Sequence, residues 1–218
     1  MGGKRIYLAL FVVLLSLVLD NSALATSVTM NYVGHQGAIA QGGSPFIGYP
    51  YYFSINGSST LTPLMCDSFD NNVIPGETWQ AKVTPFMQGV GLFGSTVSMD
   101  YKAAGLIFKN MLAGQISTTA AQWAIWGLFS ANARNDPFFA TIGGGHLDSI
   151  YLALAASAPN SNFSGLVLYT PIAGTQSGGG LPQEFIGFSP VPEPGSLTLL
   201  GTGLIGLAGV LRRKLAKL

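Results

Sequence analysis

Two residues of this sequence have side chains whose chemistry is unusual for their surroundings. Cys66, in the stretch LMCDSF, is the one cysteine of the chain, so it has no partner for an internal disulfide bond. Its thiol is left for packing or for some other covalent bond. Gln122 lies in AAQWAIW, where a side-chain amide must find hydrogen-bond partners or go unsatisfied. The aromatic side chains of Trp123, Trp126 and Phe129 would exclude water from it.

The other polar residues do not form a recognisable catalytic or metal-binding set. His35 and His146 lie in different glycine-rich stretches, and neither has further ligands at the short spacing of a zinc site. The pair His146 and Asp148 is typical of a helix start, and the stretch 67–72 lacks the closing glutamate of a calcium loop. Two glycine patterns, GVGLFG and GTGLIG, lack the strand–loop–helix setting of a nucleotide site. We therefore predict no catalytic residue, no metal and no cofactor.

The N-terminus has the pattern of an export signal. A basic start precedes an apolar stretch from Ile6 to Leu19, and a polar patch then leads to small residues up to Ala25. This order predicts a secretory signal peptide over residues 1–25, cleaved after Ala25. The apolar stretch is shorter than the ~20 residues of a membrane-spanning helix, which disfavours a retained anchor.

The C-terminus contains a second apolar stretch. From Pro194 to Leu211 no residue is charged, and Arg212, Arg213 and Lys214 follow at once. As a helix this stretch rises about 27 Å, close to the thickness of a hydrocarbon core of about 30 Å. We predict a single transmembrane helix over 195–211. Its basic end is expected to act as a cytoplasmic stop, with the preceding chain outside the cell.

A short turn precedes this helix. Pro192, Glu193 and Pro194 form a Pro-Glu-Pro sequence, and the two prolines keep the backbone extended. Together with the short span and the closing Arg-Arg-Lys, residues 191–218 resemble the PEP-CTERM sorting signal of Gram-negative bacterial surface proteins. The resemblance implies processing by exosortase and an association with exopolysaccharide or biofilm. A plain C-terminal anchor is the alternative.

Residues 26–173 are expected to form the exported globular domain, of the α+β class, with strands around a buried helical middle. Residues 174–190 form a Gly/Ser/Pro-rich linker in which 184–188 can be a last strand. Periodicity and turn residues predict a loop over 34–48 and the following elements: strands at 27–33, 51–55, 77–83 and 165–170, and helices at 100–114, 117–133 and 146–157.

The surroundings of Cys66 and Gln122 resemble the thioester domains, or TQxA family, of bacterial surface adhesins. In this sequence Gln122, Ala124, Ile125 and Trp126 match the family pattern Q-x-A-I-W, while the sequence around Cys66 matches loosely and Ala121 replaces the usual threonine. The resemblance implies that the cysteine sulfur displaces ammonia from the glutamine amide. The resulting internal thioester can then be captured by amine-bearing targets. The alternative is a reduced, buried Cys66 with Gln122 bonded to a neighbouring loop.

These observations predict a non-enzymatic protein of the cell surface or extracellular matrix. It would cross the inner membrane of a Gram-negative bacterium and be anchored transiently by its C-terminal helix. Adhesion to exopolysaccharide or to amine-bearing surfaces is the expected role. A glycan-binding module using exposed Tyr49, Tyr51 and Tyr52 is the first alternative, and a polysaccharide-active enzyme, which needs a carboxylate pair, is the second. Between Thr26 and Pro190 the net charge is −3, so nucleic acid is not an expected partner.

Overall fold

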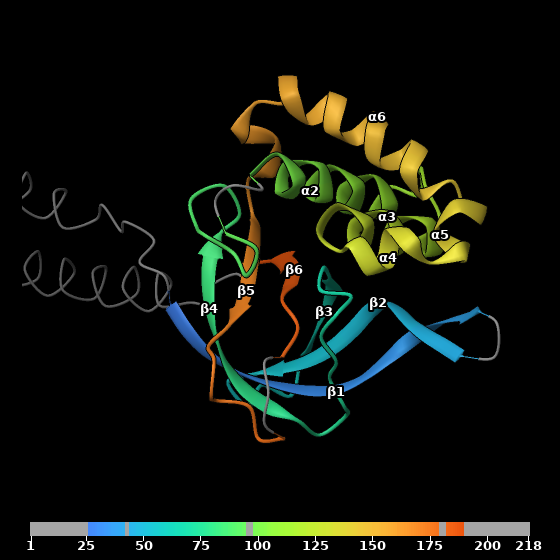
Figure 1. Ribbon diagram of the computed structural model, residues 1–218. Helices are drawn as coiled ribbons and strands as arrows, with labels where there is room; N and C mark the ends of the chain where they lie inside the picture. The colour runs from blue at the N-terminus through green and yellow to red at the C-terminus, as the bar shows by residue number, and fades with distance from the viewer. Residues whose placement is uncertain (1–25, 42–43, 95–97, 179–181, 190–218) are drawn as a thin grey trace, which may run out of the picture. The chain divides into compact units, whose positions relative to one another are not determined.

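A barrel of β-strands carries a helical insertion between its fourth and fifth strands (Figure 1). The computed structural model describes residues 26–41, 44–94, 98–178 and 182–189. Within these residues six strands close the barrel in the order β1-β2-β3-β6-β5-β4. The strands are β1 (Thr26–Gln41), β2 (Ser44–Ile55), β3 (Leu61–Cys66), β4 (Thr78–Pro85), β5 (Leu166–Pro171) and β6 (Phe185–Phe188).

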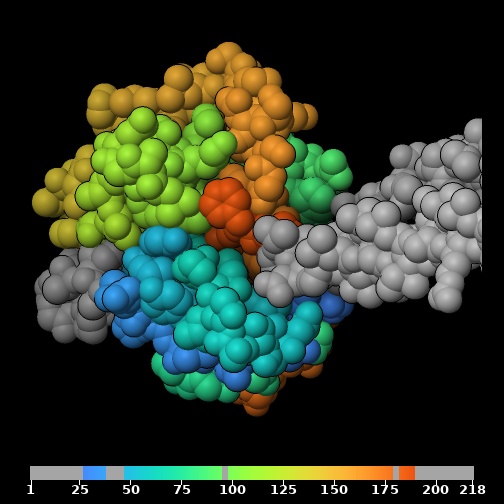
Figure 2. Space-filling view, turned by 180° about the vertical axis from the view of Figure 1, so that it is seen from behind, coloured from blue at the N-terminus to red at the C-terminus, as the bar shows by residue number. Residues whose placement is uncertain are grey.

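The helices lie together over one part of the barrel. They are α2 (Ser98–Leu112), α3 (Thr118–Phe129), α4 (Ala131–Asn135), α5 (Pro137–Thr141), α6 (Gly144–Ser157) and the 3-10 turn η2 (Asn160–Phe163). Figure 2 shows this layer, in green to gold, over the strands in blue to teal. The predicted α+β arrangement, with a helical middle flanked by strands, is therefore confirmed. No helix of the described residues is both long and apolar enough to span a membrane.

Alternation along the strands produces two cores. Neighbouring residues in a strand point to opposite faces, so Cys66 and Phe185 belong to the cluster inside the barrel, while Met65 and Ile186 belong to the cluster against the helices. The inner cluster is aromatic and includes Tyr32, Phe53, Trp79 and Tyr169. The outer cluster joins strand residues to Ile107, Phe108 and Ile125 of the helices.

Helix α3 lies between these two cores. Trp123 and Trp126 join the cluster inside the barrel, whereas Ala124 and Ile125 join the cluster on the helical side. All residues from Ala121 to Leu128 are buried, as an apolar sequence without a polar face requires. The prediction of a buried helix at this position is confirmed.

The same helix is shorter than the sequence pattern suggests. We predicted one helix over 117–133, but Ser130 ends α3 and begins α4. Its backbone is extended, with φ −124° and ψ 125°, and its hydroxyl oxygen accepts a hydrogen bond from the Ala133 amide at 3.1 Å. Serine competes for backbone hydrogen bonds in this way, which favours helix ends over helix interiors.

The predicted loop over 34–48 is wrong. These residues continue β1 and begin β2, which pair as a long antiparallel hairpin with two register shifts. A Cβ atom at Gly37 would lie 2.7 Å from the Tyr49 carbonyl oxygen, so a glycine permits this close approach of the strands. Glycine thus marks an irregularity within a strand, as well as a turn.

The last described strand, β6, lies where the sequence allows a last strand at 184–188, inside the segment predicted as a linker. β6 pairs with the end of β3, and Cys66 aligns with Phe185. Gln183 and Glu184 are buried, at 6% and 0% exposure. Residues up to Gly187 therefore belong to the body. The predicted signal peptide 1–25, with Ala25, and the predicted transmembrane helix 195–211 lie outside the described residues.

Candidate functional site

The thiol of Cys66 lies inside the barrel at the end of β3. The residue has no exposed surface, because β3 ends between β2 and β6 at the level of α3. Its sulfur donates a long hydrogen bond to the Ser68 carbonyl oxygen, at 3.6 Å. The side chains of Trp126 and Tyr51 also form hydrogen-bond contacts with this sulfur.

Gln122 reaches the same place from α3. It is fully buried, and its Nε2 donates to the Cys66 carbonyl oxygen at 2.6 Å. Its Oε1 has no hydrogen-bond partner among the described residues. The Gln122 side chain thus meets the backbone of Cys66. Ser117 caps α3 through the Ala120 amide, at 3.2 Å, one turn before Gln122. The structure therefore places the two residues singled out from the sequence side by side.

Burial controls the protonation of the thiol. It raises the pKa of Cys66 above its ordinary value, and Asp67, when ionised, raises it further. Hydrogen-bond contacts with Trp126, with the backbone of Ser68 and with Tyr51 act in the opposite direction but are smaller effects. The thiol is therefore protonated at neutral pH, and any reaction at this sulfur must move its proton.

Next to Cys66 lies a buried pair of carboxyl groups that the sequence analysis missed. Asp67 and Glu184 have no exposed surface, and their side chains hydrogen-bond each other. The Tyr101 hydroxyl donates to Glu184 Oε1 at 2.6 Å, and the Leu92 amide donates to Glu184 Oε2 at 2.7 Å. The Thr170 hydroxyl also donates to Glu184 Oε2. Glu184 is thus held by donors from three separate segments.

The surroundings of Asp67 disfavour its ionisation. Burial raises the pKa of Asp67 well above its ordinary value, and the charge and hydrogen bond of Glu184 raise it further. Two carboxyl groups in contact cannot both ionise in a medium of low polarity. The pair was invisible in the sequence because its members lie far apart along the chain, and only the pairing of β3 with β6 joins them. Neither residue lines the pocket described next.

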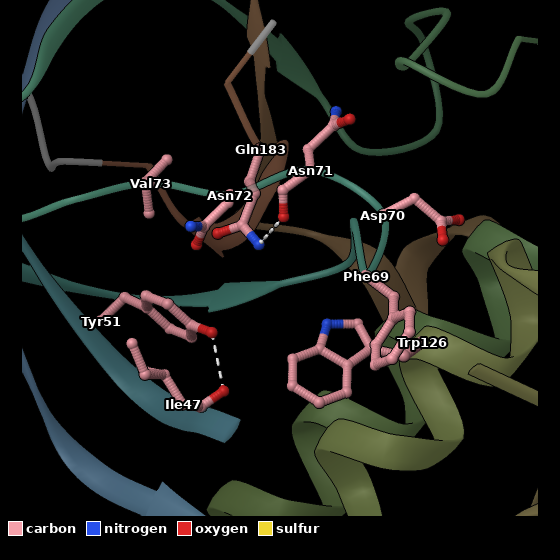
Figure 3. A pocket seen from close by; sticks show the side chains of 9 residues that line it. All are labelled: Ile47, Tyr51, Phe69, Asp70, Asn71, Asn72, Val73, Trp126 and Gln183. Atoms are coloured by element: carbon pink, nitrogen blue, oxygen red, sulfur yellow. Dashed lines mark hydrogen bonds between the residues drawn. The ribbon is translucent and has the colours of Figure 1, made fainter. Parts of the chain in front are cut away.

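A pocket of about 320 Å³ lies beside the buried thiol (Figure 3). Tyr51 of β2 and Trp126 of α3 lie on opposite sides of it, and Phe69, in the loop after β3, packs on Trp126 with ring centroids 5.3 Å apart. Since Tyr51 and Trp126 also contact the Cys66 sulfur, the pocket and the buried pair of Cys66 and Gln122 share a wall.

Other residues considered in the sequence are not brought together. His35 and His146 are both exposed, and the described residues contain no group of three or more His, Cys, Asp or Glu side chains suited to a metal ion. Asp148 is buried, at 8% exposure, and lies beyond the first turn of α6, so it does not act at the start of this helix.

The aromatic set for glycan binding also changes. Tyr51 is 2% exposed and donates its hydroxyl proton to the Ile47 carbonyl oxygen at 2.7 Å, so it is a buried residue and not the exposed one that we predicted. Tyr49 and Tyr52 are half-buried. These three residues therefore do not form the exposed aromatic platform expected of a glycan-binding module.

The predicted sorting signal lies outside the described residues and is supported by comparison with known families. Pro192, Glu193 and Pro194 and the basic end of Arg212, Arg213 and Lys214 fall within residues 190–214, which match the sequence model of the PEP-CTERM protein-sorting motif. No curated protein and no solved structure matches the chain. The match supports an exported protein that is processed by exosortase and sorted to the cell surface or the extracellular space.

Proposed function

We propose that this protein is an adhesive component of a bacterial surface or matrix, and that Cys66 and Gln122 form an internal thioester in its body. The observation that carries the proposal is the contact between the two residues: Gln122 Nε2 lies 2.6 Å from the Cys66 carbonyl oxygen, and both residues are fully buried. The Gln122 amide is thereby held against the residue whose sulfur would attack it.

The proposed reaction balances without a cofactor. The Cys66 sulfur forms a bond to the Gln122 amide carbon, the carbon–nitrogen bond breaks, and the thiol proton leaves with the nitrogen as ammonia. Because burial raises the pKa of Cys66, the thiol holds its proton at rest. The proton must leave the sulfur as the sulfur attacks the amide carbon, and it is then taken up by the leaving nitrogen. The same burial slows hydrolysis of the product, since water has little access to it.

The proposal extends to the life of the protein outside the cell. Export and sorting through the C-terminal motif would deliver the folded body to the surface of a Gram-negative cell, after a stage anchored by the predicted helix 195–211. There the thioester would attach the protein covalently to amines of a surface or matrix. We propose a binding role and no enzymatic turnover, because each thioester is consumed when it reacts.

Intact mass spectrometry of the mature protein, recovered from its own cells, tests this function. We expect a mass lower than that of the processed sequence by one ammonia. A Cys66→Ala variant should show no such deficit, and peptide mapping of both proteins locates the two processed ends. A wild-type protein that carries its full mass, with a free thiol, would refute the thioester and leave a reduced buried cysteine.

A further inference from the structure

β1 and β2 extend beyond the closed barrel as a two-stranded arm. In the described part of the chain, β1 pairs with β4 as far as Asn31, and β2 pairs with β3 from Tyr51 onward. In the arm, which we define as residues 37–41 of β1 and 44–48 of β2, these strands pair with each other alone (Figure 1). A closed barrel has no open edge, so the arm is the part of this sheet that closure does not protect.

The two edges of the arm differ. Pro45 and Pro50 interrupt the row of backbone N–H donors on the β2 edge, as prolines do on edge strands. The β1 edge contains no proline over residues 37–41, and its two register shifts lie before this stretch. An additional strand would therefore meet a regular row of five residues on the β1 edge and an interrupted row on the β2 edge.

The arm also lacks the charges that usually protect an open edge. Many proteins carry lysine or other charged residues on edge strands, because these prevent pairing with the edge of a second sheet. From Thr26 to Cys66 there is no Asp, Glu, Lys or Arg, although the net charge between Thr26 and Pro190 is −3. Two copies that meet through these strands bring no charged side chain of one strand against the other. Copies that meet elsewhere bring together surfaces with an excess of acidic residues.

The sequence of the β1 edge is nearly symmetric about its middle residue. It reads Gly-Ala-Ile-Ala-Gln over residues 37–41. When two antiparallel copies pair about Ile39, this residue lies opposite its own counterpart, and Ala38 lies opposite Ala40 of the other copy. Each apolar residue then has an apolar residue as its cross-strand neighbour. The partner that this symmetry favours is a second copy of the chain.

We propose that two copies of this protein associate through the β1 edges of their arms and form one continuous antiparallel sheet centred on Ile39. Main-chain hydrogen bonds along five residues would hold the contact, as when an extended segment adds to an open sheet edge. The contact is small, so we expect a weak dimer with a Kd of about 10–100 μM. Where many copies are held close together on a surface, such a contact would link neighbouring copies. This inference goes beyond the proposed adhesive role and does not depend on the thioester.

Sedimentation velocity of the mature protein, over a range of concentrations, tests this association. We expect the wild type to dimerise reversibly. Ile39→Lys should weaken the dimer about tenfold or more, because like charges then lie opposite each other and the apolar pair is lost. Val33→Lys is the matched control, since Val33 lies in the same strand, is 47% exposed and is outside the row of five residues. This variant should dimerise as the wild type does, and circular dichroism checks that both variants are folded.

Three results would overturn the proposal. The first is a wild type that stays monomeric up to about 0.5 mM, well above the expected Kd. The second is a dimer that Ile39→Lys leaves unchanged. The third is a dimer that Val33→Lys weakens as much as Ile39→Lys does, because the contact would then not be centred on Ile39.

Mixing two variants tests the two-fold register directly. Ile39→Glu alone should weaken the dimer as Ile39→Lys does. An equimolar mixture of the two variants should recover dimerisation, because opposite charges then face each other across the axis. A contact that joins position 39 to a different position, or to a different protein, gives no such recovery. A mixture that dimerises no better than either variant alone would overturn the proposed contact.

The arm contact and the thioester can fail separately. The mixing experiment is repeated with Cys66→Ala in both variants, which prevents thioester formation. Recovery in this background supports the arm contact, whatever the mass of the wild-type protein. A wild-type dimer that persists in denaturant, and that Cys66→Ala abolishes, would be a covalent product of the thioester and would overturn the arm contact.

Discussion

Opening the proposed thioester with methylamine should lower the thermal stability of the protein. The bond would join the end of β3, at Cys66, to the middle of α3, at Gln122, and so cross-link the barrel to the helical insertion. Methylamine converts the thioester to an N-methylamide on Gln122 and a free thiol on Cys66. The sequence and the fold stay the same, and the covalent link is the one thing removed.

The size of the effect follows from the loop that the bond closes. Roughly 57 residues lie from Cys66 to Gln122, and a cross-link over such a loop restricts the unfolded chain by about 4 kcal/mol. The opened protein regains a hydrogen bond of the kind seen between Gln122 Nε2 and the Cys66 carbonyl oxygen, which returns about 1 kcal/mol. The net loss of about 3 kcal/mol corresponds to a melting temperature lower by about 6–12 °C for a domain of this size.

Thermal unfolding followed by circular dichroism, before and after methylamine, measures this shift, and intact mass reports the extent of reaction. The Cys66→Ala variant is the control, because it has no thioester and its melting temperature should not respond to methylamine. If mass spectrometry shows complete opening of the thioester and the melting temperature moves by less than about 2 °C, then the bond does not restrain the unfolded chain as reasoned here.

Three further predictions concern single residues. The Gln122→Glu variant should keep its full mass, since it has no amide nitrogen to lose, and intact mass spectrometry checks this. Burial raises the pKa of Asp148 to about 7, with Asp100 adding to the effect and Arg134 opposing it. The unfolded chain loses this proton above about pH 3.8, whereas the folded protein keeps it up to about pH 7. The contribution of Asp148 to the free energy of unfolding therefore falls as the pH rises from about 3.8 to about 7. In urea titrations run across this pH range, the Asp148→Asn variant should lack this fall in the free energy of unfolding. A variant whose stability changes with pH in parallel with that of the wild type would contradict the prediction. Phe53 is fully buried, with its ring centroid 4.7 Å from that of Phe185. The Phe53→Ala change should therefore lower the free energy of unfolding by about 3–5 kcal/mol. The Leu61→Ala change, at an exposed position, should lower it far less in the same urea titration.

Local patterns predicted the parts of the site that depend on local structure. The apolar run around Gln122 identified a buried helix. The strand predicted over 77–83 is present as β4, and its alternate residues Trp79, Ala81 and Val83 all lie toward the core inside the barrel. Burial and periodicity suffice for such predictions, because each depends on neighbours within one element.

Long-range pairing supplied what the sequence could not predict. The contact between Asp67 and Glu184 depends on β6 pairing with β3, and no local pattern indicates that two acidic residues so far apart will meet. The pocket is similar, since its walls come from β2, α3, the loop after β3 and Gln183. The loop predicted over 34–48 failed for a different reason: glycines that permit close approach within a hairpin resemble glycines of a turn.

The proposed thioester must be shielded from water and must also be reached by an amine. Different sides of α3 would serve these two requirements. On the side of Ala124 and Ile125 the helix is fixed against the outer core, where both residues have no exposed surface. On the opposite side Trp126 faces a pocket bordered by the half-buried Phe69. If the thioester forms, an amine would reach the acyl carbon by rotation of aromatic side chains, without movement of the helix that carries Gln122. The loop after β3 would then control access, while α3 and the barrel would hold the reacting groups in place.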